Sequence, residues 1–577
     1  MNTSTRLQFG LLGPIAKTLG KLIMLSLLVA TALSSLALAA TCPDPTNNAG
    51  YVRAGAAGSG SGADWTNAFT DIPSTLVRGC TYYIAAGTYP PHVFNTAVSG
   101  TSLITIQAPT VSNHGTSTGW SSSYVGQAVW QMTASGGPIW DVSQADYFVF
   151  NGSYCTSRTD YPAICDSGYG FKLDTQGYTI NGNTGNDCEL CGLVQGGYGA
   201  YGTSANYDSH DQIFEYIELY GSNRGNTINS TQPADAGFSF SGGSYDLLFS
   251  HNYVHNTCWQ FFLRGNHEGG QSFAPGSGAN ITIQYSHLYW DGAGLNSDPN
   301  SPHGTPLDES EGIQDYTVRY NLITDMGGDG SASGGTSNGP DTASGADYNS
   351  GNGYGGPWYI YGNIWYSDND LKCASGDGVM AVYDFSMTNG DVYLVNNTFA
   401  NMGWPICTAE VNTFLGLGLS YTTPFEGLYE ENNLFYQMDA SPVNPTTFIA
   451  NGATTNGSTG SGGGATFSPA VVHGYDAWFA SPETGAADTG ANAQVSSSYP
   501  FVSASTYNFN LATDTTAGVT LSNVGTYWNG SALVANTLNI DMNGVMRGAN
   551  GTWDRGAIQR GGSTDPTPPT NPTWTVH

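Results

Sequence analysis

The sequence predicts an all-β protein: a right-handed parallel β-helix with three short strands per coil and a short N-terminal capping helix. Three observations lead to this prediction. The chain has 12% aromatic but only 10% charged residues, so it is poor in the Lys, Glu and Leu that favour helices. Seven segments repeat one strand–turn–strand pattern at nearly constant spacing. A leader for export precedes them.

The leader is a signal peptide over residues 1–39. Three basic residues precede an apolar run over residues 22–38, and Ala37-Leu38-Ala39 supplies the small residues of a cleavage site. The run is slightly short for a membrane span, and no later stretch could cross a bilayer. We therefore expect a secreted, extracellular protein with no membrane span in the mature chain.

The mature chain is strongly acidic. Without the leader it keeps 11 basic and 44 acidic residues, a formal charge of −33. Such a charge repels nucleic acid and anionic membrane surfaces. We therefore expect no nucleic-acid partner. Polyanionic sugars are repelled as well, unless metal ions bridge the charges.

The repeat determines the predicted fold. Each copy has an apolar-alternating strand, a polar turn and a second short strand, and the copies recur at intervals of 35, 34, 35, 42, 34 and 36 residues. No helix-forming stretch lies inside a repeat, so parallel strands that stack coil on coil explain the period better than helical repeats do. An earlier copy, from Asp146, is expected two coils upstream. The aligned strand positions are Phe214, Phe249, Ile283, Val318, Ile360, Leu394 and Glu430.

Asparagine dominates the turn of the repeat, three residues beyond each aligned position. Ile217 and Ser286 replace it in two of the seven copies. Stacked Asn amides can hydrogen-bond along the axis of a solenoid. The five turn asparagines are Asn252, Asn321, Asn363, Asn397 and Asn433.

The N-N-x-F turns at Asn396 and Asn432, together with the repeats, resemble the pectate-lyase-like superfamily of right-handed parallel β-helices. The opening segment YVRAGAAGSGSGADWTNAF and the ending DMNGVMRGANGTWDRGAIQ are also similar to that superfamily. The resemblance implies a short helix at residues 64–76 over the open end, and a closing segment that finishes the last coil. Within the closing segment we expect Asp541, Arg547 and Asp554 to form a structural ion-pair cluster.

These signals divide the chain into five parts. We expect a signal peptide at 1–39, a cap with the first coils at 40–135, central β-helix repeats at 136–437, C-terminal coils with the closing segment at 438–560, and a Pro/Thr-rich tail at 561–577.

The mature chain has nine cysteines, and export makes disulfides plausible. Closeness in sequence favours three pairs, although connectivity does not follow from sequence alone. The odd count leaves at least one thiol free. The three favoured pairs are Cys42–Cys80, Cys155–Cys165 and Cys373–Cys407.

We expect a binding groove along the strands that precede each repeat segment. Two long loops, 291–309 and 326–356, are expected to wall it, because binding residues concentrate in long loops on rigid scaffolds. The expected groove strands read GFSFSGG from Gly237, WQFFLRG from Trp259, SEGIQ from Ser310, GVMAVYD from Gly378 and FLGLGLS from Phe414.

Charged residues are scarce, so those that gather beside this groove are the candidate site. We expect Arg264, Glu311 and Asp384 to converge from successive groove strands. The catalytic candidates are Arg264, Asp308, Glu311 and Asp384, and the substrate-binding candidates are His267, Glu268, Trp290 and His303.

Two enzymatic interpretations remain open, both with a polysaccharide as partner. A lyase would use Arg264 as base, with calcium as its cofactor held by Glu268, Glu311 or Asp384. A glycoside hydrolase needs two carboxylates, which Asp308, Glu311 and Asp384 could supply. The catalytic motifs of neither class are recognisable in this chain.

A non-enzymatic interpretation is also open. A long solenoid closed by disulfides would serve as a cell-surface or matrix protein of the adhesin type. An enzyme needs a charged cluster at one level of the groove, whereas a spacer predicts charges spread over all faces. We expect a monomer in either case.

We predict that Cys373 and Cys407 form a disulfide, because one coil separates them and each follows a repeat segment on the same side. Thiol labelling of the native, non-reduced protein should modify neither residue, and labelling after reduction should modify both. A peptide map that shows either cysteine labelled without reduction would refute the pairing.

Overall fold

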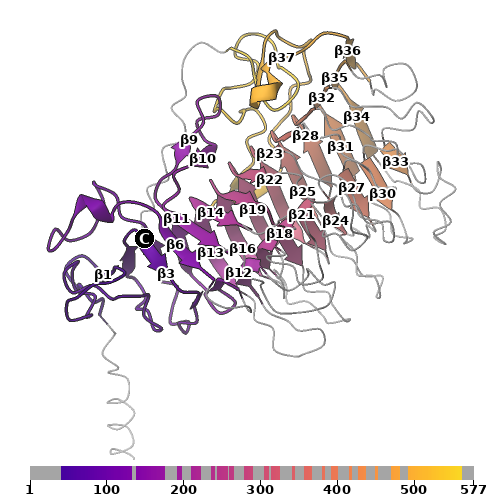
Figure 1. Ribbon diagram of the computed structural model, residues 1–577. Helices are drawn as coiled ribbons and strands as arrows, with labels where there is room; N and C mark the ends of the chain where they lie inside the picture. The colour runs from indigo at the N-terminus through magenta and orange to yellow at the C-terminus, as the bar shows by residue number, and fades with distance from the viewer. Residues whose placement is uncertain are drawn as a thin grey trace, which may run out of the picture.

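The structure is a computed structural model in which short parallel strands stack into three long sheets (Figure 1). We call them sheets A, B and C. It describes residues 41–132, 138–175, 192–197, 209–221, 236–240, 244–257, 259–264, 279–289, 305–310, 313–324, 341–344, 356–366, 380–383, 391–400, 415–418, 427–436, 449–451, 470–480 and 491–561.

Sheet A contains the first strand of every predicted repeat. The aligned residues from Phe214 to Leu394 are consecutive partners in its register and are buried, so the predicted shared core is confirmed. Its strands are β1 (Ala49–Val52), β2 (Thr81–Ile84), β5 (Ile104–Gln107), β8 (Phe148–Asn151), β13 (His210–Glu215), β16 (Tyr245–Ser250), β19 (Ala279–Gln284), β22 (Gln314–Arg319), β25 (Trp358–Tyr361), β28 (Val392–Val395), β31 (Gly427–Glu431) and β34 (Ala470–Gly474).

Sheet B contains the second strand of each repeat. One or two residues separate it from the sheet A strand of the same repeat, from β13 onward. Its strands are β3 (Gly87–Tyr89), β6 (Ala128–Gln131), β11 (Phe171–Asp174), β14 (Ile217–Tyr220), β17 (Tyr253–His255), β20 (His287–Tyr289), β23 (Leu322–Thr324), β26 (Ile364–Tyr366), β29 (Thr398–Ala400), β32 (Leu434–Tyr436), β35 (Ala477–Phe479) and β36 (Gln494–Ser496).

Sheet C lies between each sheet B strand and the next sheet A strand in the chain. From β13 to β35 the chain visits A, B and C in turn, an order consistent with a parallel β-helix or solenoid. Its strands are β4 (His92–Val93), β7 (Trp140–Asp141), β12 (Gly192–Gly196), β15 (Ala236–Phe240), β18 (Trp259–Arg264), β21 (Thr305–Ser310), β24 (Asp341–Ser344), β27 (Met380–Tyr383), β30 (Leu415–Gly418) and β33 (Ile449–Asn451).

Short antiparallel hairpins and two 3-10 turns are attached to these sheets. The hairpins are β9 (Thr156–Ser157) with β10 (Cys165–Ser167), β37 (Phe501–Ser503) with β38 (Asn508–Leu511), and β39 (Thr526–Trp528) with β40 (Leu533–Ala535). The 3-10 turns are η1 (Ser122–Tyr124) and η4 (Ala504–Thr506).

The core consists of the inward side chains of all three sheets. Phe150, Phe214 and Phe249 stack from coil to coil with ring centroids 4.9 and 5.3 Å apart. Phe150 belongs to the copy expected two coils upstream, and that expectation is wrong. Its strand β8 pairs directly with β13, so it is one coil upstream. The interval resembles two periods because β9 and β10 lie within this single coil.

Asparagine side chains join successive coils at the turn between sheets A and B, as predicted. Oδ1 of Asn363 accepts hydrogen bonds from the backbone N–H and the Nδ2 of Asn321, each at 3.0 Å. Asn397 and Asn433 repeat both bonds in the next coils. The row ends at Asp476, whose Oδ1 accepts from the backbone N–H of Asn433. All five residues are fully buried, so these bonds satisfy groups that water cannot reach.

The predicted capping helix at residues 64–76 does not form. The segment is irregular, and Asn67 donates two hydrogen bonds from its side chain and one from its backbone to the carboxylate of Asp64. Phe69 instead pairs with the edge of β1: its N–H donates to Tyr51, and its carbonyl accepts from Arg53. Backbone pairing thus covers part of an edge that would otherwise be open.

Two of the three expected disulfides are confirmed. Cys42–Cys80 and Cys155–Cys165 are bonded, with Cα atoms 5.7 and 5.8 Å apart. Cys373 and Cys407 lie outside the described residues.

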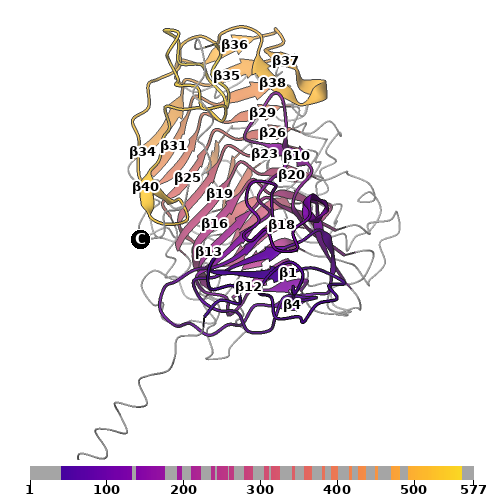
Figure 2. The ribbon, with the colours of Figure 1, turned by 90° about the vertical axis from the view of Figure 1, so that its left-hand side faces the viewer.

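The closing segment does not finish the last coil. Residues 497–561 turn back along the stack and lie beside sheets A and B (Figure 2). The Tyr320 hydroxyl donates to the carbonyls of Thr537 and Ile540, and Nδ2 of Asn432 donates to the carbonyl of Val519. The turns between A and B carry these side chains, so the segment binds where they project.

Asp541, Arg547 and Asp554 are buried in this closing segment. Arg547 donates to the backbone carbonyls of Asp554 and Ala557 at 3.2 and 2.8 Å. Burial raises the pKa of Asp541 to about 6, although the charge of Arg547 opposes that shift. The bonds stay within the segment, so they stabilise its own conformation.

We predict that Asn363→Ala destabilises the protein by about 2–5 kcal/mol. The substitution removes an acceptor from Asn321 and a donor from a sheet A carbonyl, and it leaves these buried groups unsatisfied. Chemical denaturation of the two proteins measures the difference. Asn550→Ala, in an exposed turn, is the control and should cost no more than about 1 kcal/mol. Equal losses for both variants would contradict a stabilising role of the asparagine row.

Candidate functional site

The strands expected to line a groove are strands of sheet C. GFSFSGG, WQFFLRG, GVMAVYD and FLGLGLS overlap β15, β18, β27 and β30. The fifth expectation, SEGIQ, is wrong: β21 ends at Ser310, and β22 of sheet A begins at Gln314. Pairing with β18 decides this, because it places residues 305–310 opposite residues 259–264.

The two expected loops also contain strands. β21 lies partly within residues 291–309, and β24 lies within residues 326–356. Asp308 is therefore a strand residue and not a loop residue. TPLDES and DTAS lack the apolar alternation of a half-buried strand, so only their position between sheets B and A identifies them.

The described residues hold the backbone of only two predicted site residues. Arg264 ends β18 opposite Ser310, and Asp308 is opposite Phe262. The remaining candidates lie outside the described residues: His267, Glu268, Trp290, His303, Glu311 and Asp384.

The expectation that Arg264, Glu311 and Asp384 converge from successive groove strands is corrected at one point. Glu311 follows β21 and Asp384 follows β27, and β24 lies between these two strands in sheet C. From β18 to β27 there are three strand spacings, about 14 Å. The additional strand cannot be recognised in the sequence, because β24 lacks apolar alternation.

A second polar cluster, missed in the sequence, lies on the outer face of sheet B. Oε1 of Glu218 is 3.0 Å from Nζ of Lys172 and 3.3 Å from Nε2 of His255, and its Oε2 accepts from Gln127 at 3.0 Å. Burial alone would raise the pKa of Glu218, but His255 and Lys172 lower it to about 2. Burial lowers the pKa of His255 despite the carboxylate beside it. Glu218 is thus a permanent anion and no proton donor near neutral pH.

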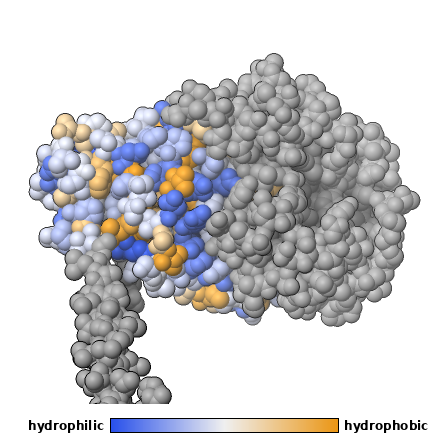
Figure 3. Space-filling model, turned by 90° about the horizontal axis from the view of Figure 1, so that it is seen from below, coloured by the Kyte–Doolittle hydropathy of each residue, from blue (hydrophilic) through white to orange (hydrophobic). Residues whose placement is uncertain are grey.

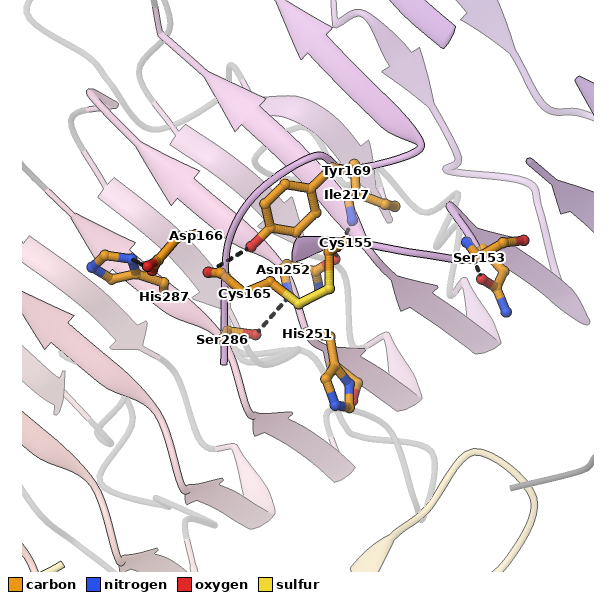
Figure 4. Close-up of a disulfide and its surroundings, with 12 residues drawn as sticks. Ser153, Cys155, Cys165, Asp166, Tyr169, Ile217, His251, Asn252, Ser286 and His287 are labelled. Atoms are coloured by element: carbon orange, nitrogen blue, oxygen red, sulfur yellow. Dashed lines mark hydrogen bonds and ion pairs between the residues drawn. A yellow bond between two sulfur atoms is a disulfide. The ribbon is translucent and has the colours of Figure 1, made fainter. Parts of the chain in front are cut away.

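The hairpin β9–β10 lies against this cluster (Figure 4). Nδ1 of His287 is 3.7 Å from Oδ1 of Asp166 on the hairpin, and its Nε2 is 2.8 Å from Oγ1 of Thr324. A carboxylate, an imidazole and a hydroxyl in line are the parts of an acyl-transfer triad. Thr324 is fully buried, however, so its hydroxyl cannot meet a substrate.

The aromatic rings of this face pack on one another. Tyr253 stacks on His255 and His287 with centroids 4.0 and 5.0 Å apart, and Tyr220 stacks on His255 at 4.5 Å. A sugar binds to the face of a ring, and these faces are already in contact with other rings. We conclude that the cluster attaches the hairpin to sheet B.

The outer face of sheet A is occupied by the closing segment. Trp528 packs with Val149, Ile213 and Leu248, and the Arg319 guanidinium lies 3.5 Å from the ring centroid of Tyr527. Among the described residues, the closing segment makes no hydrogen bond to sheet C.

Sheet C has an outward row of side chains that sequence reasoning missed. The row contains the polar Gln195 and Ser239 and the apolar Phe262, which are 8%, 4% and 1% exposed. Their neighbours in the chain point into the core, as Phe238 and Phe261 do. Only the sheet register identifies these three side chains as outward and aligned.

The described part of the chain contains no group of three or more His, Cys, Asp or Glu residues that could hold a metal ion. The predicted calcium ligands Glu268, Glu311 and Asp384 lie outside it. Within the same part, no helix is long and apolar enough to cross a membrane. The surface seen in Figure 3 mixes hydrophilic and hydrophobic residues where it is described, without one broad apolar patch.

Comparisons with protein-family models, with curated proteins and with solved structures found no match to this chain.

We predict that Glu218→Gln lowers the stability by about 1–3 kcal/mol at pH 7 and by much less near pH 2. The folded-state pKa is lowered, so the contribution of this carboxylate is present above its unfolded pKa near 4.5 and is lost as the pH falls through about 2. Urea denaturation across this range measures the difference. A loss that does not depend on pH would contradict the charge pairing.

Glu215→Gln is the matched control. We expect Glu215 to change the stability with pH in the opposite direction to Glu218. Glu215 is buried on sheet A, and burial raises its pKa to about 7. Wild-type stability should therefore fall as the pH rises from about 4.5 to about 7, and the variant should not show this fall.

Proposed function

We propose that this chain is a secreted, monomeric, right-handed parallel β-helix that binds and cleaves a polysaccharide over the outer face of sheet C. The observation that carries the proposal is the distribution of loop length. From β13 onward, sheets A and B are joined by one or two residues in each repeat. Sheet C is flanked by long connections on both sides, such as residues 290–304 before β21 and 265–278 after β18.

Loops on a rigid scaffold are where binding residues concentrate. The closing segment and the hairpin β9–β10 contact sheets A and B, which are therefore not open along their length. We place the polymer over sheet C because, among the described residues, the closing segment makes no hydrogen bond to this sheet. Burying several sugar units needs a long cleft with a few polar groups that fix orientation.

The residues that we propose for catalysis remain Arg264, Asp308, Glu311 and Asp384. In hydrolysis, one carboxylic acid gives its proton to the leaving glycosidic oxygen, and a second carboxylate removes a proton from the attacking water. In elimination, Arg264 removes the proton beside a uronate carboxylate whose charge a cation balances. Calcium would supply that charge if Glu268, Glu311 and Asp384 bind it.

The alternative proposal is a non-catalytic cell-surface or matrix protein. The observation that favours it is the bracing of the stack: two disulfides, the buried asparagine row and the closing segment resist unfolding. The disulfides also support secretion, because they persist in oxidising compartments.

We predict that the protein releases products from at least one polysaccharide in a panel of neutral and acidic polymers, assayed with and without calcium. New reducing ends without ultraviolet absorbance indicate hydrolysis, and absorbance of unsaturated products indicates elimination. Glu311→Gln and Asp384→Asn should each lower kcat by about 100-fold or more.

Glu215→Gln is the control, because it makes the same replacement of a carboxyl by an amide on sheet A, away from the proposed groove. Binding without product from any polymer would favour the alternative. Full activity of both groove variants would refute the catalytic assignment.

A further inference from the structure

The asparagine row ends at two buried carboxyl groups, those of Glu430 and Asp476. Asp476 occupies the turn position in the last repeat, and its Oδ1 accepts from the backbone N–H of Asn433 at 2.7 Å. Glu430 lies in β31, and its Oε1 accepts from Nδ2 of the same asparagine at 2.5 Å. Both carboxyl groups therefore converge on Asn433, and neither is exposed to water.

The two carboxyl groups are also hydrogen-bonded to each other. A carboxylate has no proton to donate, so this bond requires a proton on one of the partners. Burial raises the pKa of Glu430 well above its usual range, the negative charge of Asp476 raises it further, and the bond from Asn433 opposes the shift. The pair therefore retains a proton at pH values at which an exposed glutamate has lost it.

The charges around the pair favour a proton on Glu430 rather than on Asp476. The guanidinium of Arg555, in the closing segment, donates to the backbone carbonyl of Asp476 at 2.7 Å, and the charges of the two side chains attract. The charge of Glu431, the next residue of β31, raises the pKa of Glu430 as well. The titratable groups placed beside the pair are Glu431, His473, which is opposite Glu430 in the register, Tyr475 and Arg555.

The pair joins the last coil to the coil before it. Glu430 belongs to β31 and Asp476 follows β34, and these two strands are neighbours in sheet A. Loss of the shared proton leaves two like charges in contact at this junction, where water cannot solvate them. The repulsion then acts between β31 and the coil that contains β34 and β35.

We propose that the carboxyl pair of Glu430 and Asp476 is a pH-dependent switch: one bound proton keeps the last coil closed on β31, and loss of that proton opens it. The switch does not depend on a ligand, so it goes beyond the proposed function and is independent of it.

The direction of the switch follows from the raised pKa of Glu430. Its folded-state pKa lies above the unfolded value near 4.5, so the stabilisation is complete below that pH and is lost as the pH rises through the folded value. Between these two values the opening of the last coil releases one proton, and the opening equilibrium increases about tenfold per pH unit.

Hydrogen exchange of backbone amides tests the switch on the full mature chain. Exchange is followed by mass spectrometry from about pH 5 to about pH 8 and is corrected for the intrinsic base catalysis of exchange. We expect the protection of residues 470–479 to fall about tenfold per pH unit. The amides of β25, three strands away in sheet A, should not show this fall.

Glu430→Gln should remove the pH dependence and keep the last coil protected at about pH 8. The amide has the shape of the protonated acid and donates to Asp476 without a proton that titrates. Glu431→Gln is the matched control, because it makes the same replacement at the adjacent residue, and it should retain the tenfold fall. Asp476→Asn is a second test variant: it extends the asparagine row by one residue and should also abolish the fall.

Two results would overturn the switch. One is protection of residues 470–479 that does not change with pH in the wild type. The other is a fall that Glu431→Gln abolishes and that Glu430→Gln and Asp476→Asn retain. Neither result bears on polysaccharide cleavage, so the proposed function stands or fails separately.

Discussion

The structure depends on one constraint: from β13 onward, every coil repeats the turn between sheets A and B in the same register. A connection this short forces the residue after the sheet A strand into the left-handed region, as Tyr216, His251, Tyr285 and Tyr320 show with φ of 57°, 57°, 50° and 56°. The asparagine row compensates for this backbone strain with buried hydrogen bonds along the axis. From β13 onward this corner is fixed and the longer connections lie on either side of sheet C, whereas residues 108–127 and 152–170 are inserted between sheets A and B in the two preceding coils.

The same corner also determines what covers the outside of the stack. The left-handed residues project from it, and the closing segment bonds to them from Tyr320 to Asn432. The hairpin β9–β10 adds a second attachment, since Tyr161 accepts a hydrogen bond from the backbone of Phe509. Two segments far apart in the chain thus meet on sheet B, beside β37 in Figure 1. Sheets A and B are therefore the sides on which the described contacts brace the stack.

The polar cluster on sheet B contributes to this bracing. On sheet B, Glu218 has a lysine, a histidine and an amide as partners, so its charge stabilises the fold and is not available for chemistry. On sheet C, Gln195 and Ser239 have no such partners among the described residues. Buried hydroxyls without a partner among the described residues also occur on sheet A, at Thr282 and Thr317, so a missing partner does not by itself mark a binding site.

The sequence by itself determined the repeat, the register of sheet A and the asparagine row, because these depend on local alternation and on a short turn that recurs every coil. It also indicated two disulfides, from cysteines close together in the chain. It did not reveal β21 or β24, since short polar strands are defined only by the strands beside them. Nor did it foresee the single enlarged coil after Phe150, the irregular cap at Phe69, or the path of residues 497–561 along the stack. Which side chains of sheet C point outward in one row was likewise decided by tertiary structure alone, because contacts between residues distant in sequence leave no periodic signal in it.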